Sequence, residues 1–387
     1  MKVLLAGGGT AGHINPALAI ISIIKDHCPD AEFLYAGTPN GMESRLVPME
    51  NIPFAPIKVS GFQRKLTPKN IVRNIKAAAY LTTAGHTARK IIKDFGPDIV
   101  IGTGGYVSGP IVLEAEKMGI PTAIHEQNAY PGVTTRILSK KADIVMLTME
   151  EAAEYFDKSV KYIKTGLPVR KGFDPSRISR AEAKKELGLD ENSICIFSWG
   201  GSLGAGAINS NSYFNLGICY LKKGDLVSAM MNFQSTLDLN NEDLYAHFYL
   251  GNILKEMGID PETDPKLMVK EYIHNMDVCT AAADLIICRS GASAISELEA
   301  MGRASILIPS PVVAGNHQYH NAMVLGKAGA AIVIEQKDLT DELIINEAKK
   351  LCSDPARLDD LARKAHEQCI TDTPDRIYKA ITDVMKK

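Results

Sequence analysis

The sequence predicts an α/β protein of two domains, each built on a parallel β-sheet. The chain has 387 residues, which is enough for two separate hydrophobic cores. In the first half short apolar strands alternate with helices, the pattern typical of a doubly wound parallel sheet, and a new α/β unit begins at Ser193. Each half also opens with a strand, a glycine-rich turn and a helix, at residues 7–12 and 200–205. Gly and Pro break the pattern near residue 165, so we predict domains 1–165 and 166–387.

The composition excludes several classes of protein. Lys and Arg number 43 and Asp and Glu 45, so no overall charge attracts a nucleic acid, and we expect no such partner. The seven cysteines contain no C-x-x-C pair and are expected to be buried reduced thiols. No apolar run reaches the roughly 18 residues that a membrane-spanning helix needs, and the early glycines argue against a signal peptide.

The first glycine-rich turn is the feature around which the chain is organised. Residues 1–6 read as a buried strand and residues 16–25 as a helix with an apolar face. Glycines let backbone N–H groups approach an anion, and the dipole of the following helix favours negative charge there. Thr10 and His13 add polar side chains. The turn predicts a nearby phosphate or diphosphate, and its spacing, which is not G-x-G-x-x-G, disfavours a dehydrogenase.

Glycine and polar residues also follow later strands of the first half. Strands are predicted over residues 31–37, 98–101, 121–125 and 143–147. The second of these is followed by Gly102 to Tyr106 and the third by Glu126 to Asn128. Because ligands bind at the carboxyl ends of parallel strands, we expect these residues to share one cleft with the first turn. The alternatives are a plain tight turn at 102–105 and helix capping by Glu126 and Asn128.

A basic segment lies between Glu50 and Asp94, where the sequence has no acidic residue. Apolar side chains are interleaved with its basic residues, which are Lys58, Arg64, Lys65, Lys69, Arg73, Lys76, Arg89, Lys90 and Lys93. Each basic residue near an anionic membrane contributes on the order of 1 kcal/mol of binding. We therefore expect residues 58–93 to dock on anionic lipid; the alternative is an ordinary solvated helix face.

The second half repeats the strand–turn–helix pattern twice. A strand over 193–198 leads into Gly200, Gly201 and Ser202, where Ser202 is well placed for a phosphate. A strand over 284–288 leads into a Ser-Gly turn and a helix that carries Glu297. A carboxylate there can accept both hydroxyls of a ribose; the alternative is an acidic residue that favours a helix N-terminus. Arg170, at the domain boundary, either grips a phosphate or caps the rim of the cleft.

Taken together, these motifs resemble one family, the MurG group of lipid-linked N-acetylglucosaminyltransferases. The resemblance rests on GGGTAGHINPALA (7–19), GMESRLVP (41–48), GTGGYVSGP (102–110), HEQNAYPG (125–132), TGLPVR (165–170), GGSLGA (200–205), CRSGASAISELEAMG (288–302) and HQYHNA (317–322). The motifs occur in the family's order and cover residues 1–209 and about 256–387. The resemblance implies the GT-B fold, in which two Rossmann-like domains, one for the acceptor and one for the UDP-sugar, face each other across a cleft.

The resemblance also implies an activity. Members of the family move N-acetylglucosamine from UDP-GlcNAc to the C4 hydroxyl of undecaprenyl-diphospho-N-acetylmuramoyl-pentapeptide, converting lipid I to lipid II, with inversion of the anomeric centre. They use no metal and no cofactor. The implied partners are UDP-GlcNAc, lipid I and an anionic membrane surface, and the implied location is peripheral, at the cytoplasmic face of the cell membrane.

Carried over to this sequence, the resemblance implies a set of site residues. His13 is the candidate general base, because a neutral imidazole can take a hydroxyl proton near pH 7; a helix-capping histidine is the alternative. A helix N-terminus and Ser202 can stabilise the departing UDP without a metal. The implied binding residues are Thr10, Ala11 and Gly12 (donor sugar and acceptor), Gly104, Gly105 and Tyr106 (acceptor or diphosphate loop), Asn128 and Gln318 (sugar), Arg170 and Ser202 (diphosphate), Ile273 (uracil), and Ala292, Ser293, Ala294, Ile295, Ser296 and Glu297 (nucleoside).

Residues 210–255 depart from the family pattern. Tyr213, Leu216, Gly217, Tyr220, Ala229 and Phe233 fit the tetratricopeptide pattern, and its Leu-Gly pair returns 34 residues later as Leu250-Gly251, the period of that repeat. We predict a tetratricopeptide-like helical segment in place of a βα unit. Its helices are expected over 206–222, 225–239 and 242–257, with no strand between Ser202 and Lys266. Chance helical periodicity is the alternative.

An interaction protein is the second function that the sequence allows. In that case the altered UDP-sugar domain is impaired, and residues 210–255 bind a peptide or a second copy of the chain. Titration with UDP-GlcNAc separates this hypothesis from the enzyme, because an intact donor site binds the nucleotide sugar.

Overall fold

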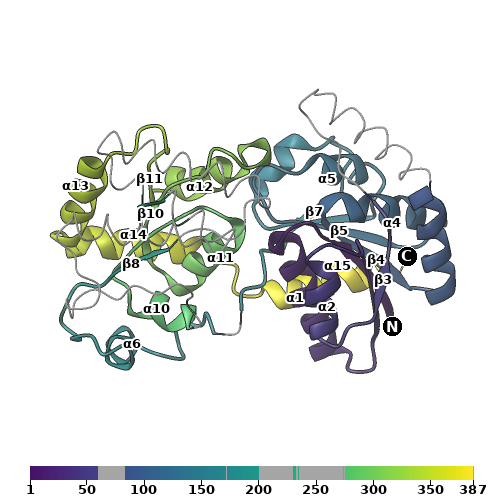
Figure 1. The fold of residues 1–387 in the computed structure, drawn as a ribbon, viewed down its shortest axis with the longest axis horizontal. Coiled ribbons are helices and arrows are strands. Elements are labelled where there is room, and N and C mark those ends of the chain that lie inside the picture. The colour runs from purple at the N-terminus through teal and green to yellow at the C-terminus, as the bar shows by residue number, and fades with distance from the viewer. Residues whose placement is uncertain are drawn as a thin grey trace. The chain divides into compact units, whose positions relative to one another are not determined.

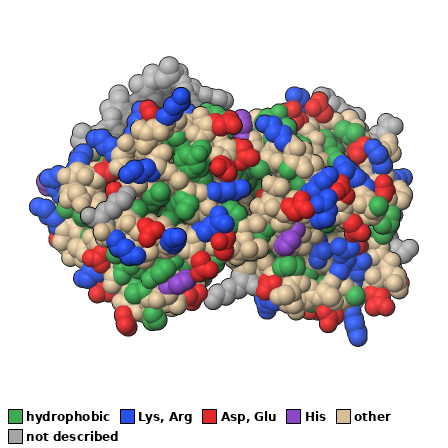
Figure 2. All heavy atoms as spheres, turned by 180° about the vertical axis from the view of Figure 1, so that it is seen from behind, with side chains coloured by type: hydrophobic (Ala, Val, Ile, Leu, Met, Phe, Trp, Pro, Cys, Tyr) green, Lys and Arg blue, Asp and Glu red, His purple; other side chains and the backbone are tan. Residues whose placement is uncertain are grey.

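The structure, a computed structural model, describes residues 1–59, 83–170, 172–199, 230–231, 234, 273 and 275–386. The chain divides into two compact units (Figure 1). Unit 1 comprises Met1–Pro168 and Ile370–Lys387, and unit 2 comprises Val169–Cys369. Basic and acidic side chains are interspersed over the face drawn in Figure 2, in line with the small net charge of −2.

Unit 1 is built on a seven-stranded sheet whose neighbouring strands are all parallel. In sheet order the strands are β3 (Phe54–Pro56), β2 (Glu32–Gly37), β1 (Lys2–Gly7), β4 (Ile99–Gly104), β5 (Thr122–Glu126), β6 (Ile144–Leu147) and β7 (Tyr162–Lys164). The strands predicted in the first half are confirmed, and β3 and β7 are short additions at the two edges.

The direction of winding reverses between β1 and β4. The chain runs from β1 outward to β3 on one side and from β4 outward to β7 on the other. The last residues of the two central strands, Gly7 and Gly104, face each other across a register irregularity that follows Ala6. Such a reversal point is where ligands bind in open α/β sheets. The fold therefore brings both glycine-rich turns to the position that favours a site.

Helices cover both faces of this sheet. Those of unit 1 are α1 (Ala11–His27), α2 (Glu43–Met49), residues 83–95, α4 (Gly105–Lys117), α5 (Val133–Leu138), the 3₁₀ helix η1 (Glu150–Tyr155) and α15 (Thr373–Met385). Alternate residues of β1 enter different cores: Val3 and Leu5 pack with α1, and Leu4 and Ala6 pack with α4. This period of two, with both faces apolar, is what a central parallel strand requires.

The C-terminal helix corrects the predicted domain boundary. We assigned residues 166–387 to the second domain, but α15 belongs to unit 1. Its residues Ile377, Ile381 and Val384 are buried in the same core as Ile20 and Ile24 of α1. Burying each such side chain stabilises the fold by roughly 1.5–3 kcal/mol. The apolar stripe of α15 therefore packs in unit 1, although the chain up to Cys369, shortly before it in the sequence, belongs to unit 2.

Among the described residues, unit 2 is built on a sheet of four strands with parallel neighbours. In sheet order they are β11 (Ile332–Val333), β10 (Ala304–Leu307), β9 (Leu285–Cys288) and β8 (Ile196–Trp199). Its helices in the described ranges are α6 (Arg180–Glu186), α10 (Met276–Ala282), α11 (Ala292–Met301), the 3₁₀ helix η2 (Ala314–Asn316), α12 (His317–Lys327), α13 (Asp341–Cys352) and α14 (Pro355–Gln368). Both strands predicted before the polar turns of this half are present.

Asp284 ties the start of β9 to two other elements of unit 2. Its carboxylate accepts 2.8 Å bonds from the Arg180 guanidinium, from Lys184 Nζ and from the backbone N–H of Cys195. Burial alone would raise the pKa of Asp284, but these donors outweigh it and hold the pKa below its usual value. The carboxylate thus joins α6 and the start of β8 to β9.

Strand β8 pairs with β9 and has no second neighbour among the described residues. Ile194, two residues before this strand, is 54% exposed, and Ile196, its first residue, is 48% exposed. The predicted helices of residues 210–255, and the predicted absence of a strand between Ser202 and Lys266, lie almost wholly outside the described residues.

Candidate active site

The two glycine-rich turns of unit 1 interlock. A Cβ placed on Gly7 would lie 2.1 Å from Oγ1 of Thr103, and one on Gly105 would lie 2.2 Å from the carbonyl oxygen of Gly8. Thr103 also donates a 2.8 Å hydrogen bond to the carbonyl of His13. Side chains at these glycines would force the turns apart, so glycine is needed here for close approach. The prediction that the two turns lie together is confirmed.

His13 sits where the turns meet. It is the third residue of α1 and is half-buried, and its Nδ1 lies 3.2 Å from Oε1 of Gln127. Gly104 lies behind the ring with a φ of 105°, and a Cβ there would come within 2.6 Å of His13 Nδ1. The imidazole is thus held against a backbone that only glycine provides.

Two buried side chains that the sequence reasoning did not single out support this histidine. Gln127 donates from Nε2 to the carbonyls of Thr103, at 3.0 Å, and His125, at 2.8 Å. His125 makes a 3.1 Å hydrogen bond from Nε2 to the carbonyl of Gly166, and burial lowers its pKa to about 4. The available signal was the motif HEQNAYPG, in which His125 and Gln127 are two residues apart at the end of a strand and so lie on one face.

A third missed residue, Glu43, lies beneath the first turn. Its fully buried carboxylate accepts hydrogen bonds from the backbone of Gly9, at 3.2 Å, and from the backbone and hydroxyl of Thr38, at 2.9 and 2.6 Å. A Cβ on Gly8 would lie 2.4 Å from this carboxylate. The protein therefore already uses the N–H of Gly9, so that donor is not available to the phosphate expected at this turn.

Glu126 organises the loop that carries Asn128. Its buried carboxylate accepts from the backbone and side chain of Asn128, at 3.1 and 3.2 Å, and from the backbone of Gly132 at 3.1 Å. Glu126 therefore holds this loop up to Gly132, the N-cap residue of α5, and the helix-capping alternative is not confirmed, because α5 has no side-chain cap hydrogen bond among the described residues. Asn128 itself is half-buried, at the carboxyl end of β5 beside Gln127.

The remaining predicted residues of unit 1 surround the same turns. Thr10 is the N-cap of α1 and Gly12 is in its first turn, and both are exposed, whereas Ala11 between them is half-buried. Gly104 is the N-cap of α4, Gly105 begins that helix with a φ of 78°, and the side chain of Tyr106 is 57% exposed. The structure thus gathers the unit 1 residues at the carboxyl ends of β1, β4 and β5.

In unit 2, two predicted ligands of the nucleotide bind each other. Arg170 contacts the carboxylate of Glu297 through Nη2 at 2.8 Å and Nε at 2.9 Å. The Glu297 side chain is 11% exposed and that of Arg170 is 62% exposed. Burial raises the pKa of Glu297, and the guanidinium partly offsets that rise. The side chains expected to bind the diphosphate and the ribose, Arg170 and Glu297, therefore form an ion pair with each other in this structure.

The N-cap of helix α11 is Gly291, a residue with no side chain to cap it, and the N-terminus of α11 has no side-chain cap hydrogen bond within the part of the chain that the structure describes. In the predicted nucleoside segment, Ser293 is exposed, Ala292 and Ala294 are half-buried, and Ser296 is buried. Ile295 is fully buried, so its side chain serves the core and only its backbone can meet a ligand.

Gln318 is the second residue of α12. Its Oε1 accepts a 2.8 Å hydrogen bond from the backbone N–H of Ser310, which leaves the amide nitrogen as the donor of the group. Its carbonyl accepts the hydroxyl of Ser290 at 2.8 Å, which links α12 to the turn after β9. Ile273 is half-buried, and Ser202 lies outside the described residues.

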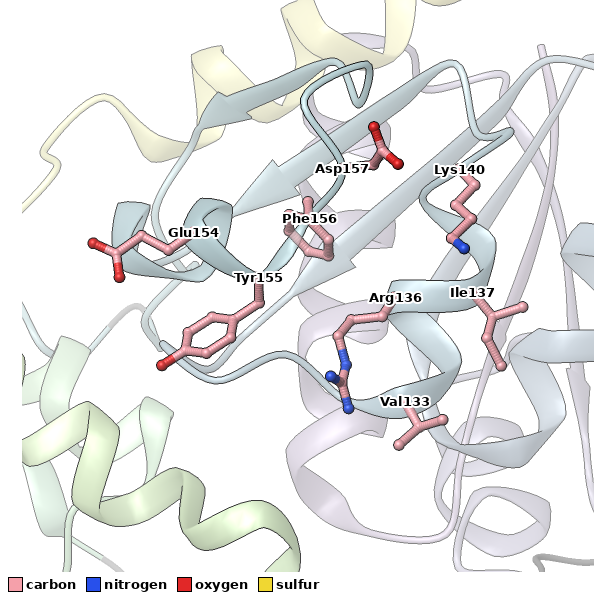
Figure 3. Close-up of a pocket in the computed structure, with 8 residues that line it drawn as sticks. All are labelled: Val133, Arg136, Ile137, Lys140, Glu154, Tyr155, Phe156 and Asp157. Carbon is pink, nitrogen blue, oxygen red and sulfur yellow. The ribbon is translucent and has the colours of Figure 1, made fainter.

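A separate shallow pocket lies on unit 1 between α5 and η1 (Figure 3). It is lined by Val133, Arg136, Ile137, Lys140, Glu154, Tyr155, Phe156 and Asp157. Val133 and Ile137 are 52% and 56% exposed, and the Arg136 guanidinium lies 5.4 Å from the ring centre of Tyr130.

Within the described ranges no helix is long and apolar enough to cross a membrane, and no group of three or more His, Cys, Asp or Glu side chains is placed to hold a metal ion.

Comparison with known proteins identifies the family. The glycosyltransferase family 28 N-terminal domain matches residues 3–147, and the glycosyltransferase family 28 C-terminal domain matches residues 223–377. The chain belongs to this family. A curated relative from Acetivibrio thermocellus, named UDP-N-acetylglucosamine–N-acetylmuramyl-(pentapeptide) pyrophosphoryl-undecaprenol N-acetylglucosamine transferase, is 43% identical over 100% of this chain and 99% of its own. One of the same name from Thermoanaerobacter is 40% identical over 99% of this chain and 100% of its own.

Solved structures agree with this family assignment. The crystal structure of MurG from Acinetobacter baumannii has a TM-score of 0.70 and 27% sequence identity, covering 99% of each chain. CalG4, the calicheamicin glycosyltransferase, has a TM-score of 0.62 at 14% identity, covering 100% of this chain and 98% of its own. The protein therefore has the α/β GT-B glycosyltransferase fold. The relatives align along the whole chain, residues 210–255 included, so they give no support to a tetratricopeptide-like replacement.

Proposed function

We propose that this chain transfers N-acetylglucosamine from UDP-GlcNAc to the C4 hydroxyl of undecaprenyl-diphospho-N-acetylmuramoyl-pentapeptide, the lipid I to lipid II step of peptidoglycan synthesis. Two curated relatives that match it from end to end, at 43% and 40% identity, carry this activity in their names. The observation that carries the proposal is the placement of His13 between the interlocked turns of unit 1. That geometry provides a base at the point where an acceptor hydroxyl would be held.

In the proposed reaction His13 takes the proton of the acceptor hydroxyl. The oxygen forms a bond to the anomeric carbon from the face opposite UDP, while the bond from that carbon to the diphosphate oxygen breaks. UDP leaves with the bonding electrons, and the anomeric centre is inverted. Thr10, Ala11, Gly12, Gly104, Gly105, Tyr106 and Asn128 are proposed to hold the acceptor and the sugar.

Donor binding is proposed for unit 2. Glu297 accepts hydrogen bonds from the ribose hydroxyls. Arg170 moves from Glu297 to the diphosphate, because the diphosphate carries more negative charge than a single carboxylate and binds the guanidinium more strongly. Ser202 and the N-terminus of α11 add donors to the same anion. Residues 292–296, Ile273 and Gln318 complete the pocket for the nucleoside, uracil and sugar. This arrangement stabilises the departing UDP without a metal.

Membrane docking is proposed for unit 1. Of the basic segment 58–93, the described part keeps Arg89, Lys90 and Lys93 on a helix whose other face, with Ala88 and Ile92, is buried. The α5 surface adds exposed Val133 and Ile137 beside Arg136 and Lys140 (Figure 3). Exposed apolar side chains beside cations suit an anionic bilayer, whereas Glu154 and Asp157 on the same surface oppose it. A peripheral position at the cytoplasmic face is the proposed location.

Vesicle binding tests this docking surface. Each cation removed should cost on the order of 1 kcal/mol of affinity for anionic vesicles, so Arg136→Gln with Lys140→Gln should weaken binding about 30-fold at low salt. A double variant of equal charge in unit 2, Lys349→Gln with Lys350→Gln, is the control. If both double variants bind equally well, or if the wild type binds neutral and anionic vesicles alike, the proposal is wrong.

For residues 210–255 the proposal remains a tetratricopeptide-like helical segment, supported by the 34-residue step of its Leu-Gly pair. Such a segment would bind a peptide or a second copy of the chain. Backbone chemical shifts should report helix across 225–239; a parallel strand paired to residues 194–198 would exclude the replacement.

Product analysis tests the proposed function directly. With radiolabelled UDP-GlcNAc and lipid I in detergent, the wild type should form lipid II, and its rate should fall sharply in His13→Ala. If the wild type binds UDP-GlcNAc yet forms no lipid II with this acceptor, the acceptor assignment is wrong. If it binds no UDP-GlcNAc, the chain is instead an interaction protein with an impaired donor site.

A further inference from the structure

The orientation of the Gln127 amide can be decided from its partners. One end of the amide faces two backbone carbonyls, that of Thr103 at 3.0 Å and that of His125 at 2.8 Å. Carbonyl oxygens only accept hydrogen bonds, so the group at this end must be the NH₂. Turned by 180°, the amide would place its oxygen against two carbonyl oxygens and leave a buried donor unpaired, at a cost of roughly 1–3 kcal/mol.

This orientation fixes the proton on His13. The amide oxygen of Gln127 lies 3.2 Å from His13 Nδ1, and an amide oxygen can only accept. Nδ1 must therefore carry the hydrogen. We propose that Gln127 is a positioning residue that locks His13 in the Nδ1–H tautomer and so leaves the Nε2 lone pair to take the acceptor's proton. The inference rests on the proposed role of His13 as the base.

His125 extends the same chain of hydrogen bonds inward. Its Nε2 faces the carbonyl of Gly166 at 3.1 Å and must donate, so in the neutral ring Nδ1 is the acceptor. That Nδ1 lies 3.1 Å from the NH₂ of Gln127. Because His125 is fully buried, it stays neutral at neutral pH. Donors and acceptors therefore alternate from Gly166 through His125 and Gln127 to His13, and the two N–H groups of Gln127 are shared among three acceptors, the carbonyls of Thr103 and His125 and Nδ1 of His125.

This chain of hydrogen bonds orients His13, but it contains no negative charge that could neutralise the imidazolium. When Nε2 takes the hydroxyl proton, Nδ1–H still donates to the amide oxygen, and no other proton moves. The positive charge stays on His13, which then releases the proton from Nε2 to solvent.

The tautomer can be read directly by ¹⁵N NMR of the histidine side chains in the whole protein without substrate. The His13 signals are identified by their loss in His13→Ala. We expect Nδ1 to be protonated and Nε2 to be bare in the wild type. In Gln127→Met, which keeps the side-chain length but removes the acceptor, the Nε2–H tautomer should appear. Gln368→Met, at the end of α14 in unit 2, should leave the His13 signals unchanged.

Kinetics give the second readout. Misplacing a reacting group by about 1 Å can cost about 100-fold, so kcat of Gln127→Met should fall by about that factor while KM for UDP-GlcNAc is unchanged. A wild-type His13 with its proton on Nε2 would overturn the inference whether or not the variant folds. An unchanged tautomer in Gln127→Met would overturn it as well. Because the tautomer is measured without turnover, a fully active His13→Ala would count against the proposed base alone.

Discussion

The site of unit 1 and the site of unit 2 follow the same strand–turn–helix plan but satisfy their polar groups differently. In unit 1 the polar groups around the turns are joined to neighbours of fixed position: Glu43 to Gly9, Thr103 to His13, and Gln127 to His13. In unit 2 the two charged groups expected to meet the nucleotide, Arg170 and Glu297, are joined to each other. One site is held in its working geometry, and the other must exchange an ion pair for a ligand.

This difference follows from what each site has to do. A base must be positioned relative to its hydroxyl with a precision of a few tenths of an ångström, and a buried, fully paired network gives that precision. A nucleotide site must keep a buried carboxylate satisfied before the ligand arrives. An arginine that is 62% exposed can do so and then turn to the diphosphate. The two sites should therefore respond differently to mutation.

The largest effect is expected from removing the proposed base. His13→Ala should reduce kcat by roughly 10²–10⁴-fold, because general-base catalysis contributes that much. The exposed histidine at position 86, in the helix over residues 83–95, is the matched control as His86→Ala. The rate of lipid II formation measures both variants. Near-native turnover in His13→Ala would return this histidine to a helix-capping role.

Gly104→Ala should cost about 100-fold in kcat, because its Cβ would come within 2.6 Å of His13 Nδ1 and displace the ring. Gly119→Ala is the control: this glycine also has a positive φ, of 71°, but a Cβ there meets nothing within 4 Å. Both variants should lose roughly 1–3 kcal/mol of stability from backbone strain. Equal kcat losses in the two variants would show that strain, and not the position of His13, decides the rate.

Asp284→Asn should destabilise unit 2 by about 3 kcal/mol, because it leaves the buried Lys184 ammonium without its counter-charge. The lowered pKa of Asp284 sets the pH dependence. Its stabilisation is complete above the pKa of the unfolded chain and is lost as the pH falls through the lower folded-state value. Urea denaturation of wild type and variant should therefore converge in acid. Asp360→Asn, at a partly exposed cluster of ion pairs with Arg357, Arg363 and Lys364 on α14, should have a much smaller effect than Asp284→Asn.

Glu297→Ala should weaken UDP binding about 10-fold, because the ribose loses charge-assisted hydrogen bonds worth more than ~1 kcal/mol. The neighbouring Glu299→Ala on the same helix is the control. Since burial raises the pKa of Glu297, UDP affinity in the wild type should fall as the solution is acidified through that raised pKa. An affinity that is flat with pH and equal in both variants would remove Glu297 from the donor site.

The sequence was most informative where function follows the ends of strands. The turns after β1 and β4, and His13 between them, could be predicted because parallel strands bring their carboxyl ends to one edge. Glu43 and Gln127 were missed because their roles depend on partners 34 and 114 residues away, which no local pattern reveals. The return of α15 to unit 1 was missed for the same reason, since its apolar stripe does not say which core it joins.

Calorimetric titration of UDP into the wild type, His13→Ala and Glu297→Ala tests most directly that chemistry belongs to unit 1 and nucleotide binding to unit 2. The account predicts that His13→Ala binds UDP as the wild type does while its turnover collapses, and that Glu297→Ala binds about 10-fold more weakly. Weakened UDP binding in His13→Ala together with unchanged binding in Glu297→Ala would contradict the division of labour between the two sites.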